Sequence, residues 1–380
     1  MIYRHLLALL SISTLAAAAV PPQGDLILWY DKPATKWEQA LPVGNGHLGA
    51  MIFGAADKER IQFNEHTVWT GKPRSYARKG AVNHLPKIRE LLFAGKQREA
   101  ENLAMKEFMS DPIRQLAYQP CGDLLIESTG QGKPSDHRRW LDLDSAMAVT
   151  EWSADGVKHR RETFASHPAN LLVTRITADQ PGKTRASIRL GSPHKNHRIT
   201  LEKPATLVLR GKVQEDGVAF EARAVVLHQG GTLVENADSI DITSADSIEI
   251  RLTAATNVES WKSLAADPAK KVAATLARSS AKSYASILEA HLADHRQLFR
   301  RVKLDLGRTP EADRTTDLRI ADFRNRPRCR LAGAAGTANL LCSSRAWPVK
   351  TCSVRALFRP RSDIVPANGV PEWPRPISAR

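Results

Sequence analysis

Carboxylates and histidines are the side chains of this sequence that could perform acid, base or metal chemistry. Two pairs of carboxylates stand out: Asp142 with Asp144, and Glu59 with Glu65. Asp142 and Asp144 lie two residues apart, which on a strand places both on one face. We nevertheless expect all four to be solvated or turn-capping groups. His47 and His66 have no histidine or carboxylate at metal-ligand spacing on a recognisable scaffold, so a structural role is predicted and no metal site is expected.

The cysteines do not suggest a cofactor or a disulfide framework. Three of the four lie in the last quarter of the chain, and none forms a C-x₂-C pair: Cys121, Cys329, Cys342 and Cys352. Neither a zinc site nor a disulfide scaffold follows from these spacings. Cys121 is expected to be an ordinary buried small residue, and no cofactor is expected.

The net charge of +15 raises the question of nucleic-acid binding. Ten basic residues against Asp363 and Glu372 give residues 325–380 a net charge of +8, which leaves +7 for the first 324 residues. The sequence contains no RNA-binding aromatic motif, no helix-turn-helix pattern and no basic stripe with interleaved aromatics. Nucleic acid is therefore excluded as a partner.

The first residues are typical of an export signal. Arg4 and His5 precede an apolar run from Leu6 to Val20, which ends in small residues at an A-x-A cleavage site. We expect residues 1–19 to be a signal peptide cleaved near Ala18 or Ala19, and the protein to be periplasmic or extracellular. No other stretch approaches ~18 consecutive apolar residues, so no membrane association is expected after cleavage.

The segment 26–280 is predicted to be a large antiparallel β-sandwich, which makes the fold class mainly β. Glycine-rich residues 41–63 are typical of strand, turn and strand. Seven further short strands are predicted at 123–127, 146–152, 157–164, 171–178, 205–210, 218–228 and 247–253. Asp155-Gly156 is the clearest hairpin signal, because a type I′ turn needs positive φ at both central residues. Strands at this spacing without intervening helices favour a sandwich.

Two helical segments interrupt or follow these strands. Pro86 suits a first helical position and Gly95 a helix end, which predicts a short helical insertion over residues 86–108. Residues 282–301 carry apolar groups at helical spacing, so residues 281–324 are predicted to be a helical linker and the vestige of a following domain. Residues 325–380 show no sustained periodicity. We expect a disordered or out-of-frame tail, and favour a shifted frame or a cut from a longer gene over a natural disordered tail.

An ordered set of sequence blocks resembles the amino-terminal part of glycoside hydrolase family 95, the family of α-L-fucosidases and related exo-glycosidases. The resemblance covers residues 26–322, and its blocks are LWY at 28–30, ALPVGNGHLGAM at 40–51, ERIQFNEHTVWTG at 59–71, IRELL at 88–92, YQPCGDL at 118–124, WLDLD at 140–144 and RETFAS at 161–166. Family members place a β-sandwich first, then a helical linker, then an (α/α)₆ barrel that holds the catalytic residues. Such a barrel should begin near Asp317, and here it is not recognisable.

The resemblance therefore implies a truncated or frame-shifted fragment of a secreted enzyme acting on terminal sugars of plant or host glycans. Inverting glycoside hydrolysis needs a general acid and a group that activates water, both rigidly held. The family places both in the barrel, so no catalytic residue is assigned and we expect the chain to be inactive alone. Fucosylated carbohydrate is the implied partner.

Asn64, Glu65 and Trp69 are the candidate substrate-binding residues, because part of the family's sandwich lies against the barrel near its substrate opening. An aromatic side chain beside polar groups suits a sugar's apolar face and its hydroxyls. The alternative for these three residues, which we favour, is that they brace the interface between domains. The alternative for the whole chain is a stand-alone carbohydrate-binding or scaffold β-sandwich without hydrolase activity.

Overall fold

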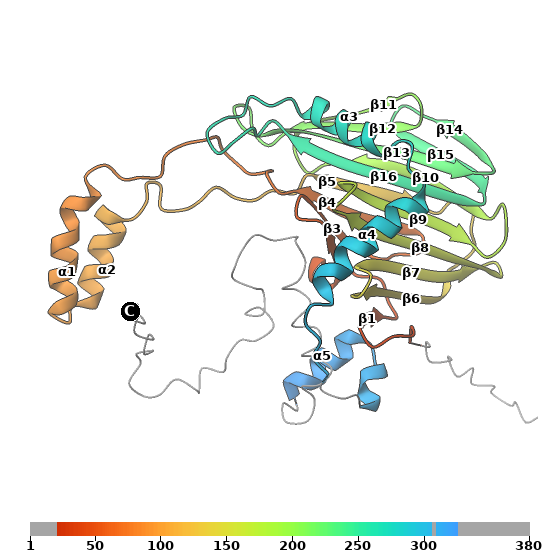
Figure 1. The fold of residues 1–380 in the computed structure, drawn as a ribbon, viewed down its shortest axis with the longest axis horizontal. Helices are drawn as coiled ribbons and strands as arrows, with labels where there is room; N and C mark the ends of the chain where they lie inside the picture. Colours follow the sequence, from red (N-terminus) through yellow and green to blue (C-terminus); the bar gives the residue numbers. More distant parts are fainter. Residues whose placement is uncertain (1–20, 306–308, 326–380) are drawn as a thin grey trace, which may run out of the picture.

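A computed structural model describes residues 21–305 and 309–325, which form a two-sheet antiparallel β-sandwich with few helices (Figure 1). The predicted fold class is therefore confirmed for these residues. The predicted signal peptide and the predicted tail lie outside the described residues. Within the described residues, no helix is both long and apolar enough to cross a membrane.

The larger sheet has nine strands, and every neighbouring pair is antiparallel. In sheet order they are β1 (Ile27–Tyr30), β6 (Ser135–Asp142), β7 (Met147–Ala154), β8 (Val157–Ser166), β9 (Leu171–Ala178), β16 (Ser247–Thr256), β13 (Ala219–Gln229), β12 (Thr206–Lys212) and β11 (Asn196–Glu202). The predicted hairpin at Asp155-Gly156 joins β7 to β8, with φ of 51° and 74°. These positive angles confirm the turn predicted from the sequence.

The smaller sheet has seven strands in the order β14 (Thr232–Glu235), β15 (Ser239–Ala245), β10 (Thr184–Gly191), β5 (Gly122–Glu127), β4 (Lys58–Glu65), β3 (Leu48–Ile52) and β2 (Leu41–Gly44). Residues 41–65 thus hold three strands, one more than the pattern predicted. The turn between β3 and β4 contains Gly54, whose φ is 73° and whose Cβ would stand 2.4 Å from Arg139 Cδ. Only glycine fits this position without displacing the arginine.

The main core lies between the two sheets, where side chains of alternate residues face each other. On β4 the inward row is Glu59, Ile61, Phe63 and Glu65, all almost fully buried. Arg161 of β8 faces Glu59 across the core and donates to its carboxylate and to the carbonyl oxygen of Ala55. Glu59 was expected to be solvated or to cap a turn. Glu59 is not solvated, because alternation along β4 directs it inward, where Arg161 neutralises it. It does cap a turn, since its Oε1 accepts the N–H of Gly54 at 2.8 Å.

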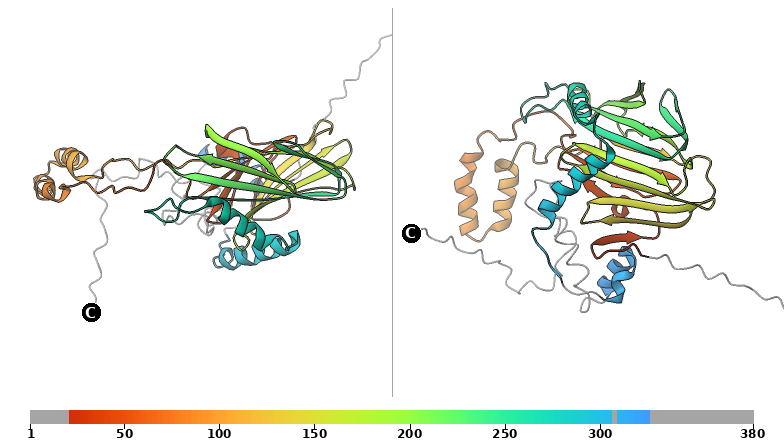
Figure 2. Two further views of the ribbon diagram at one scale, coloured as in Figure 1. Left: turned by 90° about the horizontal axis from the view of Figure 1, so that it is seen from above. Right: turned by 45° about the vertical axis from the view of Figure 1, so that its right-hand side comes forward.

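Helices cover the outer face of the nine-stranded sheet (Figures 1 and 2). The predicted linker helix is present as α4 (Tyr284–Phe299), which buries Ile287 and His291 against Trp29, Trp140 and Phe164. Before it lies α3 (Pro268–Ser279), which the sequence analysis did not predict. Asp267 caps α3 by accepting hydrogen bonds from the N–H groups of Ala269 and Lys270. The short turns η1 (Trp37–Gln39) and η4 (Pro310–Asp313) complete the connections.

The helical insertion forms an arm that projects away from the sandwich (Figure 1). It contains η2 (Ala81–His84), α1 (Leu85–Phe93), α2 (Gln97–Leu103) and the π-helical turn η3 (Ala104–Phe108). Ile88, Leu91 and Ala100 make its small core. At the other end of the described chain, α5 (Thr316–Asn325) packs beside the edge strand β1, where Thr316 Oγ1 accepts a hydrogen bond from the N–H of Trp29 at 3.0 Å.

Candidate functional site

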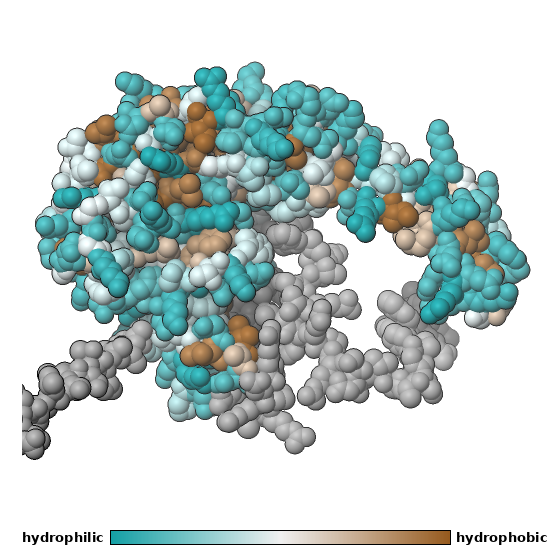
Figure 3. All heavy atoms as spheres, turned by 180° about the vertical axis from the view of Figure 1, so that it is seen from behind, coloured by the Kyte–Doolittle hydropathy of each residue, from teal (hydrophilic) through white to brown (hydrophobic). Residues whose placement is uncertain are grey.

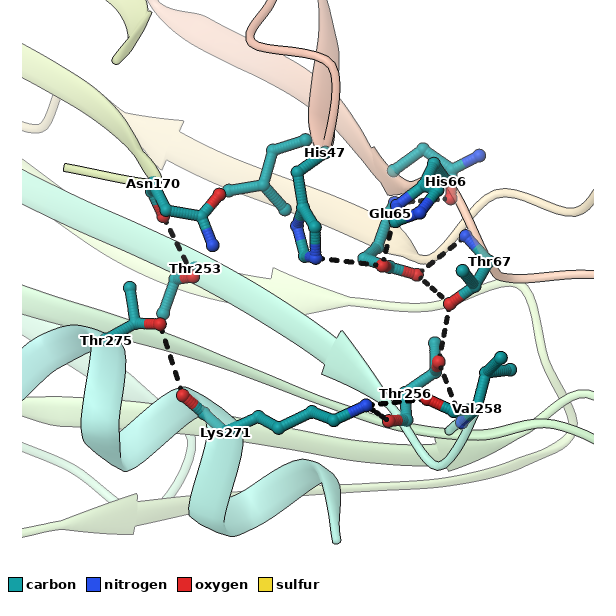
Figure 4. A network of polar contacts seen from close by, with 12 residues as sticks. His47, Glu65, His66, Thr67, Asn170, Thr253, Thr256, Val258, Lys271 and Thr275 are labelled. Carbon is teal, nitrogen blue, oxygen red and sulfur yellow. Dashed lines mark hydrogen bonds and ion pairs between the residues drawn. The ribbon is translucent and has the colours of Figure 1, made fainter. Parts of the chain in front are cut away.

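Two histidines and one buried glutamate converge at one end of the smaller sheet (Figure 4). Glu65 is the last residue of β4, and its side chain is only 2% exposed. One carboxylate oxygen, Oε1, lies 3.3 Å from His47 Nε2 and 3.0 Å from His66 Nδ1. The two imidazole rings lie 4.8 Å apart between centroids and are tilted by 58°. Both rings therefore face the same oxygen atom.

Strand pairing explains how residues nineteen positions apart meet here. Leu48 at the start of β3 pairs with Glu65, and the N–H of His66 donates to the carbonyl oxygen of His47 at 3.0 Å. On a continuous strand, neighbours such as Glu65 and His66 would point to opposite faces. Because β4 ends at Glu65 and the chain turns, His66 folds back toward the glutamate.

The second carboxylate oxygen of Glu65 anchors the cluster to the larger sheet. Oε2 accepts hydrogen bonds from the backbone N–H of Thr67 at 2.8 Å and from its hydroxyl at 2.5 Å. That hydroxyl lies 2.5 Å from the hydroxyl of Thr256, the last residue of β16. Lys271 of α3 donates to the carbonyl oxygens of Thr256 and Val258. Thr67 thus holds the carboxylate directly, while Thr256 and Lys271 extend the network to β16 and α3.

The contacts shift the pKa of all three groups. Burial alone would raise the pKa of Glu65, but hydrogen bonds from His66 and Thr67 outweigh it and hold that pKa below its usual value. The hydrogen bond to Glu65 raises the pKa of His66. Burial lowers the pKa of His47, despite the attraction of Glu65. At neutral pH, Glu65 is consequently a carboxylate and His47 a neutral imidazole.

An exposed pair of aromatic rings lies beside this cluster. Trp69 and Tyr118 are 38% and 40% exposed, and their ring centroids lie 5.1 Å apart with a 56° tilt. The indole N–H of Trp69 donates to the carbonyl oxygen of His66 at 2.9 Å. Burial of the Tyr118 hydroxyl, together with the nearby negative charge of Glu65, raises the pKa of Tyr118 to about 12. The pair presents apolar ring surface next to polar groups.

The structure brings together two of the three predicted substrate-binding residues. Glu65 is the centre of the cluster, and Trp69 is tied to its neighbour His66. Asn64 lies one residue earlier on β4, so alternation directs its side chain to the other face of the sheet. Its Oδ1 only accepts the N–H of Glu65, at 2.9 Å.

Sequence analysis missed the partners of Glu65. It assigned His47 and His66 structural roles because no carboxylate stood at ligand spacing along the chain, yet the fold places one within 3.3 Å of both. The available signal was the expected hairpin, since antiparallel pairing of residues 48 and 65 brings 47 and 66 together as well. Thr67 follows Glu65 by two residues, whereas Tyr118 and Lys271 come from distant segments, and no spacing along the chain indicated that they lie near Glu65.

The other carboxylate pair serves structure. Asp142 caps a turn, with Oδ1 accepting the N–H groups of Asp144 and Ser145. Asp144 binds Arg296 of α4 and Arg300, the residue that follows this helix, and the hydrogen bond from Arg300 holds the pKa of Asp144 low. The turn-capping role predicted for Asp142 is therefore confirmed, while Asp144 joins the sandwich to α4 instead.

A family match shows that this two-layer sandwich is of a class found at the amino terminus of glycoside hydrolases. The model of the family described as "Glycosyl hydrolase family 65, N-terminal domain" matches residues 28–261. The chain belongs to this family. The match spans both sheets, from β1 to the segment that follows β16.

Curated relatives support the same class. The chain is 28% identical over 312 residues to "Alpha-L-fucosidase 2" of Arabidopsis thaliana, covering 74% of this chain and 37% of the relative. It is 27% identical over 347 residues to "Probable alpha-fucosidase A" of Aspergillus niger, covering 82% and 42%. The chain thus spans less than half the length of these relatives. It is a glycoside hydrolase-like protein, and the resemblance of its sandwich is confirmed at that level.

"Putative kojibiose phosphorylase from human microbiome" is similar with a TM-score of 0.46 and 9% sequence identity, covering 74% of this chain and 39% of that chain.

Proposed function

We propose that this chain is the amino-terminal sandwich of an exported α-L-fucosidase of the family 95 type, which acts on terminal sugars of fucosylated plant or host glycans. The observation that carries the proposal is the family match over the whole sandwich, together with plant and fungal relatives that are both named as α-fucosidases.

We further propose that the sandwich does not hydrolyse glycosides by itself. Hydrolysis requires a protonated acid, and a carboxyl group in that role needs a raised pKa and access to the glycosidic oxygen. Burial raises the pKa of Glu59, but that side chain is sealed in the core against Arg161. Glu65 lies nearer the surface, and its pKa is lowered. Neither Glu59 nor Glu65 meets both requirements.

The alternative function is a carbohydrate-binding sandwich without hydrolase activity. The specific observation in its favour is the exposed Trp69–Tyr118 pair beside Glu65 and His66. Ring faces pack against the apolar face of a sugar, while imidazole and carboxylate groups bind hydroxyls. In an intact enzyme, the same residues would stand at the boundary between sandwich and catalytic domain.

A release assay and a binding assay separate these functions. The purified chain is incubated with an aryl α-L-fucoside, and we expect no release above the buffer rate. Release that disappears in Glu65→Gln or Glu59→Gln would place a catalytic centre in the sandwich and overturn its proposed inactivity.

In parallel, titration with L-fucose and L-galactose is followed by calorimetry. Binding that is lost in Trp69→Ala and retained in Trp261→Ala supports the binding function. Trp261 serves as the control because it is a second exposed tryptophan, 78% exposed. Equal affinity in all three proteins, or no binding at all, rejects it and leaves the cluster as a structural brace.

Export is tested separately, in a bacterial host expressing the chain with its own first residues. We expect a periplasmic product that begins after Ala18 or Ala19. Retention of the full-length chain in the cytoplasm would contradict this part of the proposal.

A further inference from the structure

The cluster of His47, Glu65 and His66 offers three metal-ligand atoms at one point, and its geometry does not depend on the proposed glycosidase relationship. Each residue contributes one atom, and the three atoms lie within 4.8 Å of one another. We propose that this cluster is a binding site for a divalent transition-metal ion of the zinc type. The site would lie where the turn between β2 and β3 meets the end of β4 (Figure 4).

The ligand separations suit a zinc-sized ion. In tetrahedral coordination with metal–ligand bonds of ~2.0–2.2 Å, two ligand atoms are separated by about 3.3–3.5 Å. Glu65 Oε1 lies 3.3 Å from His47 Nε2 and 3.0 Å from His66 Nδ1. The two histidine nitrogens lie within 4.8 Å of each other, so side-chain rotation that brings them up to about 1.3 Å closer would complete the coordination of one ion.

Hydrogen bonds already orient Glu65 in the way that they usually orient a metal-binding carboxylate. Ligating carboxylates are usually fixed by hydrogen bonds from neighbouring groups, which orient the free lone pairs toward the metal. Here Thr67 occupies Oε2 through its N–H and its hydroxyl, and Thr256 supports that hydroxyl. Oε1 is left to face the two imidazoles. This second observation distinguishes the cluster from a chance group of polar side chains.

The chemistry of the ligands selects the type of ion. Two imidazoles and one carboxylate are typical of zinc and neighbouring first-row metals, whereas calcium and magnesium prefer sites made of oxygen atoms. Side-chain exposures of 52% for His66 and 38% for His47 leave the cluster accessible from solvent. A fourth position would be filled by water or by an oxygen atom of a ligand.

Two features of the cluster reduce its affinity for a metal ion. The ammonium group of Lys271 lies close enough to disfavour positive charge at both histidines, although it is engaged with two carbonyl oxygens. His47 Nδ1 is buried without a hydrogen-bond partner, so metal binding at Nε2 would leave an unpaired N–H there. We therefore expect a site of moderate affinity, without the tight binding of a structural zinc centre.

The test uses the full chain, free of any affinity tag, with Zn²⁺ in calorimetry and Co²⁺ in visible absorption. We expect one equivalent of metal ion to bind and to raise the midpoint temperature of unfolding, since a ligand that binds only the native state stabilises it. His66→Ala should weaken metal binding at least about 100-fold. That is the largest loss expected when a residue that only supports a ligand is removed. His228→Ala, an exposed histidine far along the chain on β13, is the matched control and should bind as the unchanged chain does.

Co²⁺ absorption identifies the ligands independently of the fold stability of any variant. Nitrogen and oxygen ligands give visible bands without the near-ultraviolet thiolate band that cysteines would add. Glu65→Gln provides a second variant, because it keeps the shape of the buried side chain and removes its charge. The proposal is overturned by the absence of binding at millimolar Zn²⁺, by a thiolate band on the bound Co²⁺, or by unchanged affinity in His66→Ala. In that case the cluster is a hydrogen-bond network only.

Discussion

Individual polar residues in this protein take their role from the partners that the fold supplies. Glu65 and Glu59 occupy equivalent inward positions on the same strand, six residues apart. Glu59 meets Arg161 in the core and becomes half of a buried ion pair, whereas Glu65 meets two histidines near the end of the sheet. The sequence identified both glutamates as candidates, but it could not tell these environments apart. The two environments differ because the partners of each glutamate come from other parts of the chain.

The pKa of His291 also depends on the surroundings that the fold supplies. The ring is buried between α4 and the nine-stranded sheet, where Nε2 lies 2.8 Å from the carbonyl oxygen of Ser145. Burial lowers the pKa of His291 from 6.5 to about 4, with a further lowering from His295 and opposing contributions from Ser145 and Asp294. Between these two values, the unfolded chain binds a proton that the folded protein does not bind.

We therefore predict that stability falls as the pH is lowered from about 6.5 toward 4. At pH 5 the loss attributable to His291 should be about 2 kcal/mol, and His291→Gln should remove that part of the slope while keeping a donor for Ser145. The free energy of unfolding, measured in urea at pH 7 and pH 5, checks this. His228→Gln serves as the exposed control. Parallel pH profiles for the original chain and His291→Gln would contradict the prediction.

At the level of helices, strands and turns, the sequence predicted an element correctly where a few neighbouring residues determine a turn or a helix end. The Asp155-Gly156 turn, the helix start at Pro86 and the helix 284–299 were all predicted, and the structure contains them. Strands β1, β6, β10, β11, β14 and β15 and helix α3 were missed. β11 has no buried residue, and β6 begins with the exposed polar residues Ser135 and Asp136. Their pairing across the sheet, rather than any strong local preference, makes them strands.

The hairpin offers a direct test of a local signal. Gly156→Ala should destabilise the protein by about 1 kcal/mol, because φ at this position is 74° and alanine disfavours that region. No atom lies within 4 Å of an added Cβ, so the effect is purely conformational. Gly191→Ala is the matched control, since an added Cβ there meets only Leu125 Cδ1 at 3.9 Å. Equal unfolding free energies for the two variants would refute the assignment of the turn.

The shape of the whole molecule combines a continuous sandwich with a separate helical arm. Figure 3 shows apolar groups on the arm as well as scattered over the sandwich, and Phe93 on the arm is 89% exposed. The two ends of the arm meet at the sandwich, where the N–H of Thr70 donates to Ala117 O at 2.9 Å and the N–H of Ala117 donates to Thr70 Oγ1 at 2.8 Å. The arm therefore has its own small core and a closed base.

Replacing residues 72–116 by a short Gly-Ser linker should leave the sandwich folded. Because the arm buries little surface against the sheets, we expect the thermal midpoint to change by less than about 4 °C, equivalent to ~1–2 kcal/mol for a domain of this size. Removing its exposed apolar groups should also reduce self-association in light scattering. A much larger fall in the midpoint would show that the arm stabilises the sandwich.

The sequence by itself determined the period-two pattern, the main turns and the family blocks, and from these the mainly β fold follows. These features are local or linear, so they can be read along the chain. Only the tertiary structure decided which side chains meet. His47, Glu65 and His66 come together because β3 pairs with β4, and Thr256 and Lys271 join them because the two sheets stack and α3 packs on β16. Contacts of this kind depend on strand register and sheet packing, which involve residues up to about two hundred positions apart.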